Sequence, residues 1–250
     1  MKIKRILVSQ PEPETPKSPY FDIAEKYNVK IDFRPFIRIE AISSKEFRQD
    51  RINIPDYTSL IFTSRTAIDH FFRICNELKI TVLDTTRYFC ISESIAYYLQ
   101  KYIVYRKRKI FYGKSKFEEL IDLIKKFPDE NYLVPLSKIH KQEIPMLLDK
   151  NKIKYTKAII YNTISCDMTD IKDFNYDILV FFSPSGIKSL KQNFPDFVQN
   201  STAIAAFGPT TAKAVAEAGL RLDIQAPNPT APSMPAAIEQ YIKKANKVSK

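Results

Sequence analysis

Short apolar runs alternate with longer amphipathic segments along almost the whole chain. The apolar runs predict strands at residues 6–8, 31–39, 60–62, 88–91, 132–134, 158–163, 178–182 and 204–207. The amphipathic segments predict helices at residues 20–27, 66–78, 95–101, 116–127, 143–150, 185–193, 209–218 and 234–245. One strand and one helix recur about every 25–30 residues, which is typical of an α/β fold with parallel sheets.

The pattern also repeats between the two halves of the chain. Aligned at Tyr57 and Tyr176, the segments YTSLIFTSRTAIDHFF and YDILVFFSPSGIKSLK both run from a strand through a hydroxyl-bearing turn into a helix, so that Ser64 falls on Ser183. The following units, YFCISESIAYYL and AAFGPTTAKAV, correspond in the same way. The repeat favours two similar α/β units of about 120 residues each.

Two extended segments are longer than the other predicted strands. They cover about residues 33–42 and 158–166, at equivalent points of the two halves. We expect them to pair with each other and to link the two domains.

Hydroxyl-bearing residues recur where the predicted strands end and the next helices begin. Ligands bind at the carboxyl ends of strands in open parallel sheets. The first N–H groups of each following helix lack intrahelical partners, so such turns can hold a carboxylate or a phosphate. The alternative interpretation is simple helix capping, since Ser and Thr are preferred N-caps. The turns contain Thr63 and Ser64, Ser92 and Ser94, Ser183 and Ser185, and Thr210 and Thr211.

Glycine is scarce, and its placement supports a binding role for these turns. Three of the four glycines, Gly186, Gly208 and Gly219, fall in one stretch of the second half. We expect Gly208 to let the chain turn sharply and to uncover the N–H groups beside Thr210 and Thr211, and Gly186 to do the same after Ser185. Gly219 is expected to end the preceding helix.

Composition excludes several classes of protein. No run of about 18 apolar residues is present, so no membrane span is predicted. Cys75, Cys90 and Cys166 are widely spaced without a C-x-x-C motif, which indicates free thiols in a reducing cytosol. The two histidines, which we expect to be structural (His70) and surface-exposed (His140), are too few for a histidine-based metal site.

The formal net charge is +11, which indicates a polyanionic partner. Nucleic acid, an anionic membrane surface and a small molecule with many carboxylates are all compatible with it. The segment 101–116 holds seven Lys or Arg residues interleaved with four aromatic residues, which could clamp a nucleic acid strand. An edge strand protected by lysines explains this segment more simply, because it contains no recognised RNA-binding motif.

Catalytic motifs are absent: the chain has no G-x-S-x-G, Walker A or G-x-G-x-x-G sequence. Tyr161 lies at the end of a predicted linking strand, where its phenol could donate a proton to a leaving group. The alternative is a packed aromatic side chain in a β-ladder.

Three segments together resemble the uroporphyrinogen-III synthase family: FFSPSGIKSL (181–190), AAFGPTTAKAVAEAGL (205–220) and APNPTAPSMPAAI (226–238). LIFTSRTAIDHFF and AIIYNT resemble the family's first-half unit and its tyrosine motif. The resemblance implies two flavodoxin-like or Rossmann-like α/β domains with parallel sheets, joined by a two-stranded β-ladder. It replaces the simpler division into halves by a discontinuous first domain of 1–35 plus 166–250 and a second domain of 36–165.

The resemblance also implies a reaction. Hydroxymethylbilane, a linear tetrapyrrole with eight carboxylates, loses its terminal hydroxyl as water and closes to uroporphyrinogen III with ring D inverted. No cofactor and no metal is implied, and a cytoplasmic monomer without membrane or nucleic acid partners is expected. Tyr161 is the residue implied to assist hydroxyl departure. The residues implied to hold the substrate's acidic arms are Thr63, Ser64, Ser94, Ser183, Ser185, Gly186, Gly208, Thr210 and Thr211.

The chain departs from the family pattern in two turns of the second domain. CISESIA (90–96) lacks the usual glycine, adds Glu93 and offers Ser94 in place of a threonine, while Ser137 stands near another lost glycine. Two alternatives to a fully active synthase remain open. One is a non-catalytic or weakly active relative that binds a tetrapyrrole or another polyanion. The other is a nucleic-acid-binding α/β protein that uses residues 101–116.

Overall fold

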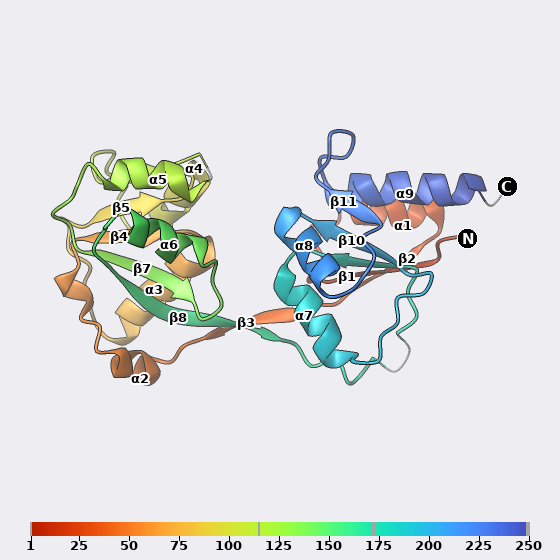
Figure 1. The fold of residues 1–250 in the computed structure, drawn as a ribbon, viewed down its shortest axis with the longest axis horizontal. Helices are drawn as coiled ribbons and strands as arrows, with labels where there is room; N and C mark the ends of the chain where they lie inside the picture. Colours follow the sequence, from red (N-terminus) through yellow and green to blue (C-terminus); the bar gives the residue numbers. More distant parts are fainter. Residues whose placement is uncertain (1, 115, 172–173, 249–250) are drawn as a thin grey trace. The chain divides into compact units, whose positions relative to one another are not determined.

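The computed structural model describes residues 2–114, 116–171 and 174–248, so Ser115 of the basic segment 101–116 lies outside the described residues. The chain divides into two compact units, Met1–Arg38 with Ile164–Lys250, and Ile39–Thr163 (Figure 1). It enters the second unit along β3 (Ile37–Ala41) and leaves it along β8 (Tyr155–Ser165). These two strands are neighbours in one sheet.

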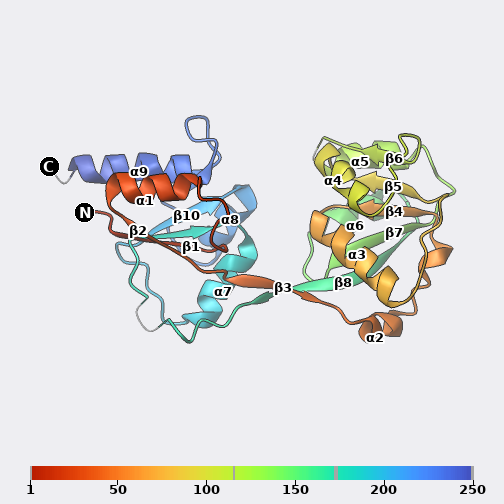
Figure 2. The same cartoon turned by 180° about the vertical axis from the view of Figure 1, so that it is seen from behind.

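The first unit is built on a five-stranded parallel sheet with strand order β11-β10-β9-β1-β2. Alternate residues of each strand face opposite sides, so Ile6 and Val8 pack on one face and Leu7 packs on the other. Helices α1 and α9 cover the first face and α7 and α8 cover the second (Figures 1 and 2). The bounds are β1 (Arg5–Val8), α1 (Pro19–Tyr27), β2 (Lys30–Phe33), β9 (Ile178–Phe181), α7 (Pro184–Asn193), β10 (Ala203–Phe207), α8 (Pro209–Glu217), β11 (Ile224–Ala226) and α9 (Met234–Val248).

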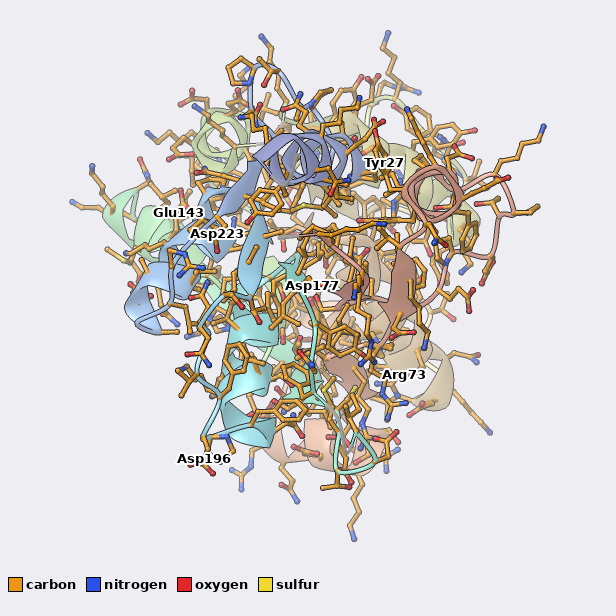
Figure 3. All side chains as sticks on the ribbon, turned by 90° about the vertical axis from the view of Figure 1, so that its right-hand side faces the viewer. Tyr27, Arg73, Glu143, Asp177, Asp196 and Asp223 are labelled. Atoms are coloured by element: carbon orange, nitrogen blue, oxygen red, sulfur yellow. The ribbon has the colours of Figure 1, made fainter. Side chains whose placement is uncertain are left out.

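Two aspartate side chains accept hydrogen bonds from backbone N–H groups near the amino ends of strands in this unit (Figure 3). The carboxylate of Asp177 accepts hydrogen bonds from the backbone N–H groups of Lys4 at 2.6 Å and Arg5 at 2.9 Å. The carboxylate of Asp223 accepts from the N–H of Ile204 at 2.9 Å. The two carboxylates thus pair backbone N–H groups that have no partner in the neighbouring strands.

The second unit is built on a six-stranded sheet with strand order β3-β8-β7-β4-β5-β6, in which the pairs from β8 to β6 are parallel. Helices α3 and α4 cover one face, while α5 and α6 cover the other. The remaining bounds are α2 (Ser44–Phe47), β4 (Ser59–Phe62), α3 (Arg65–Glu77), β5 (Arg87–Cys90), α4 (Glu93–Tyr98), β6 (Ile110–Tyr112), α5 (Phe117–Ile124), β7 (Tyr132–Ser137) and α6 (Glu143–Lys150), with 3₁₀ turns at Arg48–Asp50, Ile54–Asp56 and Leu99–Lys101.

The predicted α/β class is confirmed, with two mostly parallel sheets and with the linking strands β3 and β8 as neighbours in one of them. The single strand predicted at 31–39 is wrong, because β2 ends at Phe33 and β3 begins at Ile37. Pro35 has no N–H to donate to a ladder, and Phe36 turns into the core of the first unit. The three-residue strands β6 and β11 were not predicted, since so short a run carries little periodic signal. The strand order places β6 at the edge of its sheet. This agrees with the interpretation of the basic segment 101–116 as part of an edge strand.

Among the described residues, every helix is too short or too polar to cross a bilayer. The same residues include no cluster of three or more His, Cys, Asp or Glu side chains that could hold a metal ion. All three cysteines are free, and burial raises the pKa of the Cys75 and Cys90 thiols to about 12. Both of these thiols are therefore protonated and unreactive at neutral pH.

Candidate functional site

One edge of the second unit's sheet gathers hydroxyl groups from four neighbouring strands. Because β8, β7, β4 and β5 are adjacent and parallel, their carboxyl ends lie side by side. Tyr161 lies near the end of β8, Ser137 ends β7, Ser64 follows β4 and Ser92 follows β5. The sequence predicted strand ends at Tyr161, Ser64 and Ser92, but it did not predict that β7 extends to Ser137. The strand order sets all four residues along one edge.

Ser64 connects a helix start with the candidate catalytic tyrosine. Its side-chain oxygen accepts a hydrogen bond from the N–H of Ala67 at 3.0 Å, so it caps α3. The same oxygen lies 3.4 Å from the phenol oxygen of Tyr161, a long hydroxyl–hydroxyl contact in which either group can donate. Capping occupies only an acceptor position of Ser64, because a hydroxyl keeps one hydrogen to donate. The capping and binding interpretations of Ser64 are therefore compatible.

A β-bulge sets the position of Tyr161. Leu136 pairs with Ile159, but the next residue of β7, Ser137, pairs with Tyr161, so Ile160 is an extra residue on β8. The N–H of Lys138 then donates to the carbonyl of Tyr161 at 2.8 Å. Bulges re-aim side chains and are common beside active sites. This one turns the half-buried Tyr161 ring against α3.

His70 on α3 supports the Tyr161 ring, a contact that sequence reasoning missed. The two rings stack with centroids 5.3 Å apart and an angle of 22° between their planes. The Nε–H of Arg73 donates to Nδ1 of His70 at 3.4 Å, which makes Nδ1 an acceptor and leaves the ring hydrogen on Nε2. His70 therefore has a packing role, as expected of a structural residue, and the ring on which it packs is that of the candidate catalytic tyrosine.

We expect His70 to make folding stability depend on pH. Burial, followed by the Arg73 cation, lowers the pKa of His70 below its ordinary value of 6.5, and Asp69 offsets this only in part. The unfolded state then binds more protons, so the stability due to neutral His70 is present above pH 6.5 and is lost as the pH falls through the lowered pKa. The urea midpoint should fall more between about pH 7 and pH 5 in the wild type than in His70→Gln. Equal shifts in the two proteins would contradict this assignment.

The turn after β5 differs from the turn after β4. Ser92 occupies the N-cap position of α4 without a capping hydrogen bond, and its hydroxyl instead lies 3.0 Å from that of Ser94. Ser94 is exposed. The carboxylate of Glu93, which departs from the family pattern, accepts a hydrogen bond from the phenol of Tyr112 at 3.1 Å. This contact raises the pKa of Tyr112 and holds Glu93 toward β6.

Two buried polar atoms at and just after the end of β7 have no partner among the described residues. They are Oγ of Ser137 and Nε2 of His140. The other ring nitrogen of His140, Nδ1, lies 2.9 Å from the carbonyl oxygen of Ser137. Buried polar groups without partners are rare and often mark functional sites. His140 is half-buried rather than surface-exposed as expected.

The first unit repeats the serine turn after β9. Ser183 has φ −154° and ψ 154°, close to the φ −157° and ψ 158° of Ser64, and its hydroxyl accepts from the N–H of Gly186 at 3.3 Å. A Cβ on Gly186 would lie 3.2 Å from the ring of Phe181 and 3.9 Å from Oγ of Ser9, so the turn is closely packed. Ser185 is half-buried on the first turn of α7.

The turn after β10 depends on Gly208. Its φ of +82° lies in the region that favours glycine, and it occupies the N-cap position of α8 without a side chain to cap it. The free N–H groups of the first helical turn thus remain uncapped by a side chain, as the sequence predicts. Thr210 is exposed, whereas Thr211 is 1% exposed and its buried hydroxyl has no partner among the described residues. Thr211 can therefore offer a ligand its backbone N–H more readily than its hydroxyl.

Each unit by itself thus carries hydroxyl donors and helix N-termini at the carboxyl edge of its sheet. Tyr161, Thr63, Ser64 and Ser94 belong to the second unit, and Ser183, Ser185, Gly186, Gly208, Thr210 and Thr211 belong to the first. Such groups bind carboxylates through hydrogen bonds and the helix dipole. The contact between the Tyr161 phenol and the Ser64 hydroxyl lies in the second unit.

Comparisons with known proteins bear on the family and the fold of the chain. The family model described as uroporphyrinogen-III synthase HemD matches residues 20–236. A mutant uroporphyrinogen III synthase from the extremely thermophilic bacterium Thermus thermophilus superposes with a TM-score of 0.63 at 14% identity, covering 98% of this chain and 99% of that one. The uroporphyrinogen-III synthetase of Helicobacter pylori gives a TM-score of 0.64 at 18% identity, covering 97% and 100%. At these identities the two structures establish the fold alone. Curated proteins include no significant match.

Proposed function

The chain belongs to the uroporphyrinogen-III synthase family, and from this premise we propose how its own residues act on hydroxymethylbilane. The protein is a cyclising lyase of haem biosynthesis. Its reaction removes the terminal hydroxyl of the linear tetrapyrrole as water, inverts ring D and closes the macrocycle to uroporphyrinogen III. The observation that carries the residue assignments is the contact between Tyr161 and the α3 turn at Ser64.

Tyr161 supplies the proton that the departing hydroxyl needs. Loss of hydroxide is difficult, whereas loss of water is easier, so a positioned acid accelerates the step. When Ser64 donates its hydroxyl hydrogen to the phenol oxygen, the phenol hydrogen of Tyr161 is left for the substrate. His70 holds the ring from the side. Departure gives an electrophilic azafulvene, which the substituted carbon of ring D attacks to form the spiro intermediate.

The turns of both units bind the acetate and propionate arms. Thr63, Ser94, Ser183, Ser185 and Thr210 offer hydroxyl hydrogens, and Thr211 offers its backbone N–H at the start of α8. Gly186 and Gly208 shape the starts of α7 and α8, since their own N–H groups donate to Ser183 and Ala226. Ser64 serves the site by donating its one hydroxyl hydrogen to Tyr161. The net charge of +11 attracts a substrate with eight carboxylates over longer distances. Each unit then acts as one domain of the enzyme, with the linking strands β3 and β8 between the two.

Control of substrate conformation accounts for most of the catalysis. Unassisted closure of the azafulvene gives the uninverted isomer I, so the enzyme has to favour one geometry of ring closure. Holding reacting atoms in a productive geometry supplies about 7–11 kcal/mol of a barrier in favourable cases. This explains why a tyrosine and a set of hydrogen-bond donors suffice without a dyad or triad.

Supplying hydroxymethylbilane to the purified protein should yield isomer III as the main product. Isomers I and III are resolved by chromatography, with a protein-free sample as the control for spontaneous closure. A non-catalytic relative would leave isomer I as the product at the spontaneous rate, and that result would overturn the enzymatic assignment.

The remaining assignments concern the state of the protein in the cell. We place it in the cytoplasm, since its three cysteines are free, and we assign it a monomeric state without a nucleic acid partner. Gel filtration at micromolar concentration checks the monomer.

A further inference from the structure

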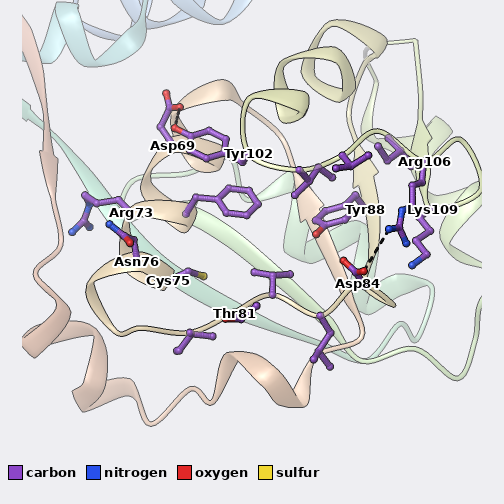
Figure 4. A pocket seen from close by; sticks show the side chains of 17 residues that line it. Asp69, Arg73, Cys75, Asn76, Thr81, Asp84, Tyr88, Tyr102, Arg106 and Lys109 are labelled. Atoms are coloured by element: carbon purple, nitrogen blue, oxygen red, sulfur yellow. Dashed lines mark hydrogen bonds and ion pairs between the residues drawn. The ribbon is translucent and has the colours of Figure 1, made fainter.

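A cavity of about 820 Å³ lies in the second unit, away from the hydroxyl turns. It is formed by the second half of α3, the loop after it, the segment that leads into β6 and the starts of β5 and β6 (Figure 4). Tyr88 is the second residue of β5 and Ile110 is the first of β6, so the cavity opens at the amino edge of the sheet. Ser64 and Ser92 follow the carboxyl ends of their strands. The cavity is thus at the opposite edge from the candidate site.

The lining of the cavity mixes apolar and polar side chains, and it includes aromatic rings. The rings of Phe72 and Tyr102 stack with centroids 4.6 Å apart and planes within 3° of parallel. Aliphatic side chains complete the lining, namely Ile80, Val82, Leu83, Ile103, Val104 and Ile110. Leu83 and Val104 are unusually exposed for their type, at 55% and 79%. A bound apolar body would cover this surface, which is the usual source of affinity in small-molecule pockets.

Polar groups gather at one end of the cavity, where Tyr88, Arg106 and Lys109 lie around the carboxylate of Asp84 (Figure 4). Tyr88 is only 5% exposed, yet its hydroxyl makes no hydrogen bond with a described residue. Burial raises the pKa of this phenol, so it is a neutral O–H donor. Lys109 is half-buried, and its ammonium likewise makes no ion pair within the described chain. Three donors therefore meet at this end without strong partners of their own.

The other charged side chains of the cavity have partners within the protein, either in hydrogen bonds or in a weak, exposed ion pair. Asp69 accepts hydrogen bonds from the phenols of Tyr98 and Tyr102, and Arg73 donates to the carbonyl of Ile42. Arg106 pairs with Asp84 at 3.4 Å, but both side chains are more than half exposed. An exposed pair of this kind contributes little to stability, so a ligand carboxylate can replace Asp84 as the partner of Arg106.

We propose that this cavity binds a planar aromatic carboxylate, whose rings lie against Phe72 and Val82 and whose carboxylate meets Tyr88, Arg106 and Lys109. The aromatic side chains of the lining favour a ring system over a flexible chain, and its cations Arg106 and Lys109 favour an anion. The assignment also explains why basic and aromatic residues interleave in the segment 101–116, which supplies Tyr102, Arg106 and Lys109. It stands independently of the proposed catalytic residues.

Calorimetric titration of the full chain with 2-naphthoate tests the proposal. Arg106→Gln with Lys109→Gln should weaken binding about tenfold, and Tyr88→Phe about fivefold, because each change removes hydrogen bonds to the carboxylate. Val82→Trp should abolish binding by filling the cavity, with circular dichroism to check its fold. Lys125→Gln with Lys126→Gln, two exposed lysines of the same unit outside the cavity, is the matched control and should bind as the wild type does.

Two further ligands test the chemical class. The neutral 2-naphthamide should bind about tenfold more weakly than 2-naphthoate, and decanoate should also bind more weakly. Equal binding of the amide would overturn the role of the anion, and tighter binding of decanoate would overturn the aromatic assignment. Absence of naphthoate binding at millimolar concentration, or affinities unchanged in the cavity variants, would overturn the site itself.

Discussion

Replacing Tyr161 by phenylalanine should slow the formation of isomer III by about 100-fold, the lower end of what a positioned proton donor contributes. The ring that stacks on His70 is kept, and only the hydroxyl that contacts Ser64 is lost. The fold should therefore be retained. Isomer I should rise as a share of product, because substrate that escapes the slowed enzyme closes spontaneously. Single-turnover assays with chromatographic separation of the isomers measure both effects.

Tyr155→Phe is the matched control for this experiment. Tyr155 lies on the same strand, β8, and is also half-buried, but its hydroxyl lies 3.5 Å from the carbonyl of Pro145, away from the turns. Its rate should equal that of the wild type. If Tyr161→Phe forms isomer III as fast as Tyr155→Phe, then the phenol donates no proton in the slow step, and positioning alone accounts for catalysis.

Phe89→Ala should destabilise the second unit by about 3–5 kcal/mol, the usual cost of emptying a large buried aromatic site. Phe89 belongs to β5 and is fully buried, and its ring packs on the face of the sheet that α5 covers. Its ring contacts those of Phe111, Phe127 and Tyr132 at centroid distances of 5.1 to 5.8 Å. Because domains are stable by only about 5–15 kcal/mol, this loss would leave much of the unit near its unfolding transition. Urea denaturation followed by circular dichroism measures it.

Tyr97→Ala is the control, because it removes an aromatic side chain that is not buried. Tyr97 belongs to the same unit but is 73% exposed, so its loss should change stability by less than about 0.5 kcal/mol. Hydrogen exchange assigns the unfolding transition to Ile39–Thr163 in both variants. A destabilisation in Phe89→Ala no larger than that in Tyr97→Ala would show that the cluster around Phe89 does not hold this unit together.

The local pattern of apolar and polar residues predicted much of the architecture. Apolar runs and amphipathic segments predicted nearly every long strand and helix, because parallel strands covered on both faces are continuously apolar while their covering helices are not. The hydroxyl turns were also readable, since each follows a strand and starts a helix. The repeat aligned Ser64 with Ser183, and these two residues share one backbone conformation and one capping hydrogen bond. Local sequence thus determined the fold class, the turns and the capping residues.

Only the tertiary structure decided which of these groups meet. The stack of His70 on Tyr161 depends on an extra residue in β8, and no pattern of a single strand reveals a bulge that is defined against its partner strand. The cavity lined by Tyr88 and Lys109 joins segments whose sequences give no sign of proximity. The buried atoms of Ser137 and His140 became apparent in the same way. The sequence by itself determined the elements and the chemistry at their ends, whereas strand order and register decided the contacts, because those depend on packing between residues far apart in the chain.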